Sequence, residues 1–278
     1  MIKSAILGLV SAVCLGGVLM CAAKQANAQD ILTITKDTVI VKGGFDGKMA
    51  GKFIMDISKS QGEVVEVFID SPGGSIDSLL EMMDFMDTQR ALGKKFRCMS
   101  NFAASAASAL FNYCDERLIM NNTTLMFHNA SFGLRGGASP HVATMYAYIN
   151  KSIDVLEVRN AKRMRMSLSA YRAAVRDDLW LYGKEGITRN AADKITNITC
   201  DPSLFSVVIK QKVDLGMFTL DVEWSGCPLI TYPMTISGMS QLPQTVDKKT
   251  QQKLNYTKMG SSEFVKWSQQ EGLSLWGE

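Results

Sequence analysis

Strand-like and helix-like segments alternate along residues 38–156, and this alternation restricts the fold more than any other feature of the chain. Short β-branched or apolar runs, typical of strands, occur at 38–42, 64–69, 95–99, 117–120 and 124–128. Segments with apolar residues at helical spacing lie between or after them, at 49–57, 76–86, 103–113 and from 140 onward. Because strand–helix–strand connections favour parallel pairing, we predict an α/β fold with a mostly parallel sheet flanked by helices.

The first 28 residues differ from the rest and resemble an export signal. Lys3 supplies a positive start, residues 5–23 are uncharged and mostly apolar, and Ala26 and Ala28 are the small residues of a cleavage site. We expect cleavage after Ala28 and a periplasmic or secreted protein. The alternative is an uncleaved membrane anchor, since 19 such residues can just span a bilayer. A lipoprotein is disfavoured because the residues before Cys21 are bulky.

Beyond Ile195 the alternation weakens. We therefore divide the expected mature chain into a main domain at 29–199 and a C-terminal extension of unclear role at 200–278. Without residues 1–28 the formal net charge falls from +3 to +1, because Lys3 and Lys24 leave with the signal. This balance gives no electrostatic reason to expect a nucleic-acid partner.

Four cysteines remain after the expected signal, and an even number in an oxidising compartment predicts two disulfides. Pairing Cys98 with Cys114 and Cys200 with Cys227 is the simplest of three connectivities, and the sequence does not choose among them. The chain has no CxxC motif and only two histidines, so we expect no zinc site and no metal.

The segment IDSPGGSID, residues 69–77, ends a strand and opens a helix. Such a turn brings bare backbone to the carboxyl edge of a sheet, where α/β proteins usually bind ligands. Glycine lets a ligand approach the backbone N–H groups closely. Pro-Gly-Gly alone is more often a simple turn, so this signal is weak without partners.

The segment NFAASAAS, residues 101–108, repeats this geometry one unit later and contains two serines. Ser105 lies in the first turn of the expected helix, whereas Ser108 lies almost a turn further and faces away. A serine nucleophile needs a base, and the base needs an orienting group. His128 ends a strand beside a glycine-rich stretch, while His141 opens a helix and is expected to face solvent. Asp177 or Asp178 is a candidate orienting carboxylate.

The order and spacing of four segments resemble the proteolytic subunit of the Clp protease, a serine peptidase of the crotonase-like fold. The resemblance covers roughly residues 36–196. It rests on IDSPGGSID, NFAASAASALF, TTLMFHNASFG and DLWLYGKEGITRNAADKI. It implies repeated ββα units, an extended peptide or unfolded protein as substrate, a ring-shaped homo-oligomer and no cofactor. An ATP-driven unfoldase partner is not expected for an exported chain.

Carried over residue by residue, the resemblance implies that Ser105 is the nucleophile, His128 the general base and Asp178 the orienting carboxylate. It implies an oxyanion hole formed by the N–H groups of Gly74 and Ala106.

The peptide substrate would lie beside Gly73, Ser75 and Asn129, along the glycine-rich stretch 133–137. Strand-like pairing there would give affinity with modest side-chain selectivity. Asn190 stands where the family has a helix-ending glycine, and asparagine tolerates left-handed dihedrals.

Other functions remain open. The chain could be an inactive exported binding or assembly protein that keeps the fold. Thioester chemistry on acyl-CoA is disfavoured because CoA is not expected outside the cytoplasm. A serine–lysine peptidase would not depend on His128.

Overall fold

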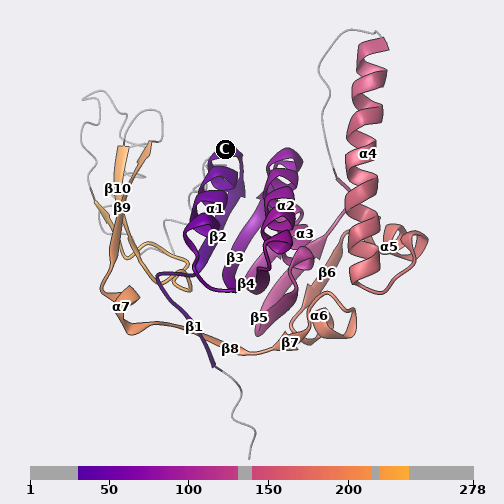
Figure 1. The fold of residues 1–278 in the computed structure, drawn as a ribbon. Coiled ribbons are helices and arrows are strands. Elements are labelled where there is room, and N and C mark those ends of the chain that lie inside the picture. The colour runs from indigo at the N-terminus through magenta and orange to yellow at the C-terminus, as the bar shows by residue number, and fades with distance from the viewer. Residues whose placement is uncertain (1–30, 131–139, 215–218, 238–278) are drawn as a thin grey trace, which may run out of the picture.

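The fold is built around one central sheet (Figure 1). The computed structural model describes residues 31–130, 140–214 and 219–237. The strands of the central sheet are β2 (Val39–Phe45), β3 (Val64–Gly74), β4 (Lys95–Ala104), β5 (Glu116–Phe127), β6 (Leu179–Tyr182) and β7 (Lys194–Ile195). Strands β2 to β5 are parallel in sequence order, β6 is antiparallel to β5, and β7 pairs in parallel with β5. The predicted mostly parallel α/β sheet flanked by helices is confirmed.

Helices lie between successive strands of this sheet and pack on one of its faces. They are α1 (Gly47–Lys59), α2 (Ile76–Ala91), α3 (Ala106–Tyr113), α4 (Pro140–Arg163), α5 (Leu168–Val175) and α6 (Lys184–Thr188). Asp46 and Ser75 cap α1 and α2, each accepting a hydrogen bond from a backbone N–H three residues later. The apolar spacing of α2 buries Leu79, Met83 and Met86 against the sheet.

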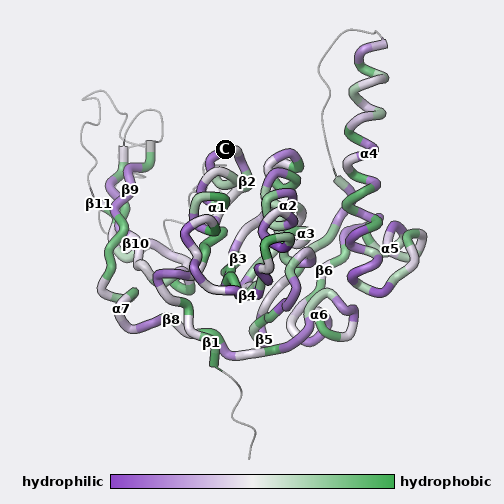
Figure 2. Tube along the Cα trace, in the orientation of Figure 1, coloured by the Kyte–Doolittle hydropathy of each residue, from purple (hydrophilic) through white to green (hydrophobic). Residues whose placement is uncertain are grey.

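The opposite face of the sheet carries a second, smaller core. Because side chains alternate across a strand, Phe68, Met99 and Leu118 point away from the helices. Strand β1 (Ile31–Ile34) and strand β8 (Asn197–Cys200) pair in parallel and cover this face. The hydropathy of the chain follows the same division, with hydrophobic stretches concentrated in the inner strands and in the inward sides of the helices (Figure 2).

The first part of the predicted C-terminal extension folds against this second core. It contains α7 (Pro202–Phe205) and an antiparallel three-stranded sheet, β9 (Val208–Asp214), β10 (Thr219–Ser225) and β11 (Thr235–Ser237). A disulfide joins Cys200 to Cys227, with Cα atoms 5.8 Å apart. A second disulfide joins Cys98 in β4 to Cys114 at the end of α3, with Cα atoms 5.9 Å apart. The simplest of the three connectivities is therefore the one that forms.

Several boundaries differ from the sequence prediction. The two strands expected at 117–120 and 124–128 form one long strand, β5, and the helix expected from Ala103 begins at Ala106 because β4 continues through Ala104. Apolar spacing from residue 140 onward predicted a helix, and α4 forms there, but Met145 near its start is 49% exposed. Figure 1 shows the reason: this half of α4 projects beyond the body of the molecule.

The expected signal, the stretch 133–137 and the end of the C-terminal extension lie outside the described residues. The domain boundary at residue 199 stays a prediction. Within the described part of the chain, no helix combines the length and the apolar character that a membrane span requires.

Candidate active site

Ser105 lies at the sharp junction between β4 and α3. Its φ of 57° is in the left-handed region, which non-glycine residues rarely adopt and which is typical of strained functional positions. The Ser105 N–H donates to the carbonyl of Met126 on β5 at 2.9 Å, and this bond fixes the turn. Ala106 is the first residue of α3, so its N–H has no acceptor within the helix.

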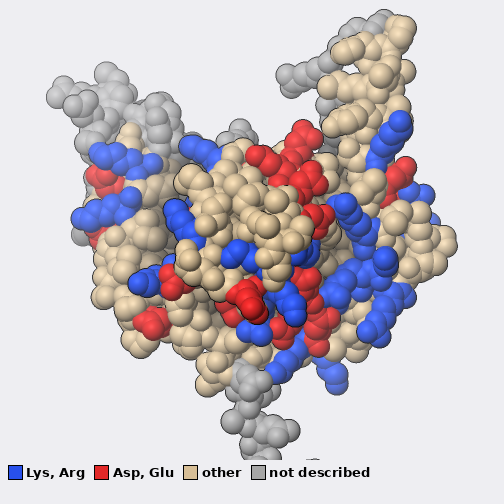
Figure 3. All heavy atoms as spheres, in the orientation of Figure 1, with Lys and Arg blue, Asp and Glu red and all other residues tan. Residues whose placement is uncertain are grey.

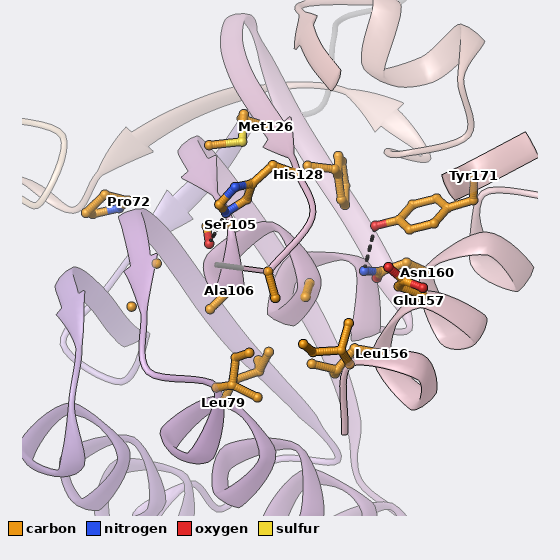
Figure 4. Close-up of a pocket in the computed structure, with 17 residues that line it drawn as sticks. Pro72, Leu79, Ser105, Ala106, Met126, His128, Leu156, Glu157, Asn160 and Tyr171 are labelled. Carbon is orange, nitrogen blue, oxygen red and sulfur yellow. Dashed lines mark hydrogen bonds between the residues drawn. The ribbon is translucent and has the colours of Figure 1, made fainter. Parts of the chain in front are cut away.

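His128 follows the end of β5 and meets Ser105 from the neighbouring strand. The distance between His128 Nε2 and Ser105 Oγ is 2.7 Å, a hydrogen-bond distance for a serine and its base. Figure 4 shows the imidazole ring directly over the hydroxyl. The expected solvent exposure of His141 agrees with its position in the first turn of α4, where it is exposed.

Asp178 lies next to His128 along the sheet edge, but its carboxylate is not bonded to the ring. The antiparallel register pairs Phe127 with Leu179, so one further step places Asp178 opposite His128. Asp178 is exposed and has a φ of 58°. Among the described residues, no hydrogen bond joins its carboxylate to His128. Asp177 instead pairs with Arg176 on the surface, at 3.2 Å.

The Gly-Gly turn at the end of β3 lies against the Ser105 junction. A Cβ atom on Gly73 would lie 2.6 Å from the Ala104 carbonyl oxygen and 2.7 Å from the Ala106 nitrogen, so only glycine fits this close approach. The N–H of Gly73 donates to Ser71 Oγ at 3.1 Å, and that of Ser75 donates to the Phe45 carbonyl at 2.9 Å. The Gly-Gly turn therefore lies in contact with the backbone on both sides of Ser105.

The other residues singled out in the sequence have different surroundings. Ser108 is fully buried, and its Oγ lies 2.7 Å from the Ser105 carbonyl and 2.6 Å from the Met126 carbonyl. It therefore supports the turn. Ser75 is an exposed helix cap whose Oγ accepts from Ser78 N–H, and Asn129 is exposed directly after His128.

A cavity of about 490 Å³ opens beside Ser105 and His128. Its walls are mostly apolar, and its far end is polar. The lining residues are Pro72, Gly73, Gly74, Ile76, Leu79, Ser105, Ala106, Ala109, Met126, Phe127, His128, Ala130, Ile153, Leu156, Glu157, Asn160 and Tyr171. Figure 4 shows Glu157, Asn160 and Tyr171 across the cavity from Ser105.

Sequence reasoning missed this polar end. Glu157 and Asn160 lie on the same side of α4 as Ile153 and Leu156, at spacings of three and four residues. A polar residue that falls on an otherwise apolar helix side was the signal that could have found them.

A buried polar network supports the polar end of the cavity from behind. Asn160 Nδ2 donates to the Tyr171 hydroxyl at 3.1 Å and Asn112 Nδ2 donates to Asn160 Oδ1 at 2.9 Å. Burial raises the pKa of Tyr171 to about 12. Arg117, which is 2% exposed, donates to Asn112 Oδ1 at 2.5 Å and to both carboxylate oxygens of Asp193. The network thereby connects α3, α4, α5 and β5.

A second ion pair, between Lys42 and Asp70, lies beside the C-terminal extension. Lys42 on β2 lies 3.8 Å from the carboxylate of Asp70 on β3 and donates to the carbonyls of Pro228 and Ile230 at 3.0 Å. Burial lowers the pKa of Lys42 and raises that of Asp70, and the attraction between the two charges opposes both shifts. The extension is therefore bonded to β2 through Lys42, and Lys42 in turn pairs with β3, the strand that ends in the turn.

Within the described ranges, no group of three or more His, Cys, Asp or Glu side chains is arranged to hold a metal ion. The two disulfides are typical of proteins outside the cytoplasm. The family model for Clp protease matches residues 12–199, which is about two thirds of the chain. No curated protein matches the sequence.

Proposed function

Because the chain belongs to the Clp protease family, we propose that it is a serine endopeptidase that uses Ser105 and His128. Family membership supports peptidase chemistry in general. The finer assignment depends on one observation, the 2.7 Å contact between His128 Nε2 and Ser105 Oγ. A hydroxyl is a weak nucleophile unless a base accepts its proton, and this contact provides the base.

In the proposed reaction, Ser105 Oγ attacks the carbonyl carbon of the scissile peptide bond while His128 Nε2 accepts the hydroxyl proton. The tetrahedral intermediate then breaks its C–N bond, and His128 returns the proton to the departing amine. Water attacks the acyl–enzyme in the same way, with His128 again accepting a proton, and releases Ser105 and the carboxylic acid. Asp178 would hold the imidazolium through Nδ1 after a rotation of its exposed side chain.

The N–H groups of Gly74 and Ala106 are the proposed oxyanion hole. Two observations support this proposal. The N–H of Ala106 begins a helix and has no intrahelical acceptor, and the close approach of Gly73 to the Ala104 carbonyl and the Ala106 nitrogen brings the neighbouring Gly74 to the Ser105 junction. Loss of one such donor typically lowers kcat by about 10² to 10³.

The test is labelling with a fluorophosphonate, which reacts with activated serines. We expect labelling of the wild-type protein at Ser105 and loss of labelling in Ser105→Ala and His128→Ala. Ser58→Ala, which removes an exposed hydroxyl on α1, is the matched control and should label normally. Labelling that persists in Ser105→Ala would refute the assignment.

One observation favours a second candidate, an inactive binding or assembly protein. The Asp178 carboxylate is exposed and, within the described residues, makes no hydrogen bond to His128. An imidazole without an orienting acid is a poorer base. This candidate would be favoured if folded wild-type protein takes no label and peptide substrates incubated with it remain uncleaved.

We also propose export with removal of residues 1–28, and self-association. The intact mass of protein recovered outside the cytoplasm tests the first, since it reports the cleavage site and the two disulfides together. Self-association is supported by the exposed apolar side chains of the projecting half of α4, where Met145, Tyr146 and Tyr148 are 49%, 52% and 63% exposed. Figure 3 shows that this half of α4 carries few charged side chains. Sedimentation measures the oligomer.

A further inference from the structure

We propose that Glu157 makes this site selective for substrates with a lysine or arginine on the acyl side of the cleaved bond. The inference rests on the proposed function, because it concerns the cavity into which Ser105 faces. It adds a substrate class that the apolar walls of that cavity do not suggest.

The position of the cavity decides which substrate residue enters it. The residue whose carbonyl Ser105 attacks has its side chain only two bonds from the attacked carbon. That side chain therefore begins beside Ser105 and Ala106, where the cavity opens. Leu79, on α2, and Leu156, on α4, line the same cavity, and Glu157 lies across it from Ser105 (Figure 4).

Charge at the far end of the cavity is negative. Glu157 Oε2 accepts a hydrogen bond from Arg172 Nε at 2.7 Å, and the same guanidinium donates to Asp154 Oδ1 at 2.5 Å. Two carboxylates thus share one guanidinium, and among the described residues no other cation pairs with either of them, so this group carries one excess negative charge. The Glu157 side chain is 15% exposed and lines the cavity, whereas Asp154 is 61% exposed and does not.

The neighbouring polar groups are already engaged. Asn160 donates to Tyr171 and accepts from Asn112, so its amide is fixed within the buried network. Glu157 Oε1, by contrast, makes no hydrogen bond to another described side chain and is available as an acceptor. A donor that reaches the far end of the cavity therefore meets Glu157.

Lysine and arginine match both parts of this cavity. Their aliphatic stems pack along apolar surface while the charged end reaches a polar partner. Leu79, Ala109 and Leu156 offer the apolar surface, and Glu157 offers the partner. A substrate glutamate at this position would bring two carboxylates together at low solvent exposure and is disfavoured.

The test compares fluorogenic peptides that differ only in the residue before the cleaved bond, which is lysine, norleucine or glutamate. Norleucine has the same aliphatic stem as lysine without the charge. We expect wild-type kcat/KM to be highest for lysine and lowest for glutamate. In Glu157→Gln, which keeps the shape and removes the charge, the lysine-to-norleucine ratio of kcat/KM should fall about 10-fold.

Glu81→Gln is the matched control, because Glu81 is an exposed carboxylate on α2 that does not line the cavity, and its ratio should equal the wild-type ratio. An active enzyme whose ratio is the same in wild type and Glu157→Gln would overturn this inference alone. An equal fall of the ratio in Glu81→Gln would also overturn it, since the effect would then be one of general surface charge. If Ser105 takes no fluorophosphonate label and no peptide is cleaved, the proposed function fails and this inference fails with it.

Discussion

Loss of the Arg117 side chain should lower the stability of this protein strongly, because its charge is buried and bonded to several acceptors. Its guanidinium is 3% exposed and donates to Asn112 Oδ1, to the carbonyl of Asn190 at 2.8 Å and to both oxygens of Asp193. Arg117→Met keeps the aliphatic stem and removes every one of these donors. Asn112 Oδ1 and the Asn190 carbonyl then lose this donor, and Asp193 keeps only the Arg117 backbone N–H, at 2.9 Å, and Arg163, at 3.3 Å.

The magnitude follows from burial. Removal of one partner of a buried ion pair typically costs about 3 to 5 kcal/mol. Asp193 is 36% exposed, so water screens part of its loss, and we expect the lower end, about 3 kcal/mol. Since domains are stable by only about 5 to 15 kcal/mol, this is a large fraction of the total.

Urea unfolding with both disulfides intact measures the change. Arg97→Met is the matched control, because Arg97 also bridges two carboxylates, Glu66 and Glu116, but its side chain is 33% exposed. An exposed pair of this kind is worth about 0.2 to 1 kcal/mol. The reasoning is refuted if Arg117→Met costs no more than Arg97→Met.

The same pair predicts a pH dependence. Burial alone would raise the pKa of Asp193, but the hydrogen bonds and charge of Arg117 hold that pKa below its ordinary value of 3.8. The carboxylate therefore adds stability above about pH 4, and this stability is lost as the pH falls through the folded pKa. In Arg117→Met the difference in the free energy of unfolding between pH 7 and pH 3 should become smaller, and urea unfolding at both pH values measures it.

Two further changes test how the site is held. The double variant Cys200→Ser, Cys227→Ser removes the disulfide that joins residues 27 positions apart, and it should lower the free energy of unfolding by about 3 kcal/mol. The loss should be visible as a lower Tm and as faster proteolysis of residues 200–237. An unchanged cleavage pattern would contradict the anchoring role of this disulfide. In Gly73→Ala the new Cβ would lie 2.6 Å from the Ala104 carbonyl oxygen, so the rate of fluorophosphonate labelling should fall about 100-fold or more. Gly51→Ala is the control, because no atom lies within 4 Å of its new Cβ, and it should label as wild type.

The sequence by itself determined the elements that depend on local periodicity and on particular small residues. Apolar spacing located α1 and α2, short apolar runs located the starts of β3 and β4, and the glycines marked a turn that only bare backbone permits. The positive φ expected for Asn190 is also observed, at 53°. The order of the motifs led to the prediction that Ser105, and not Ser108, acts with His128, and the structure places the Ser105 and His128 side chains 2.7 Å apart.

Only the tertiary structure decided features that join residues distant in the chain. The choice among three disulfide connectivities required the Cα positions, and the merging of two apolar runs into β5 required the pairing of β5 with β4 and β6. The polar end of the cavity forms where α4 and α5 pack against α2 and α3, and no local sequence pattern predicts this packing. Periodicity in the sequence predicts which side of a helix or strand is buried. Which element covers that side depends on packing over the whole chain, and this packing places Glu157 across the cavity from Ser105.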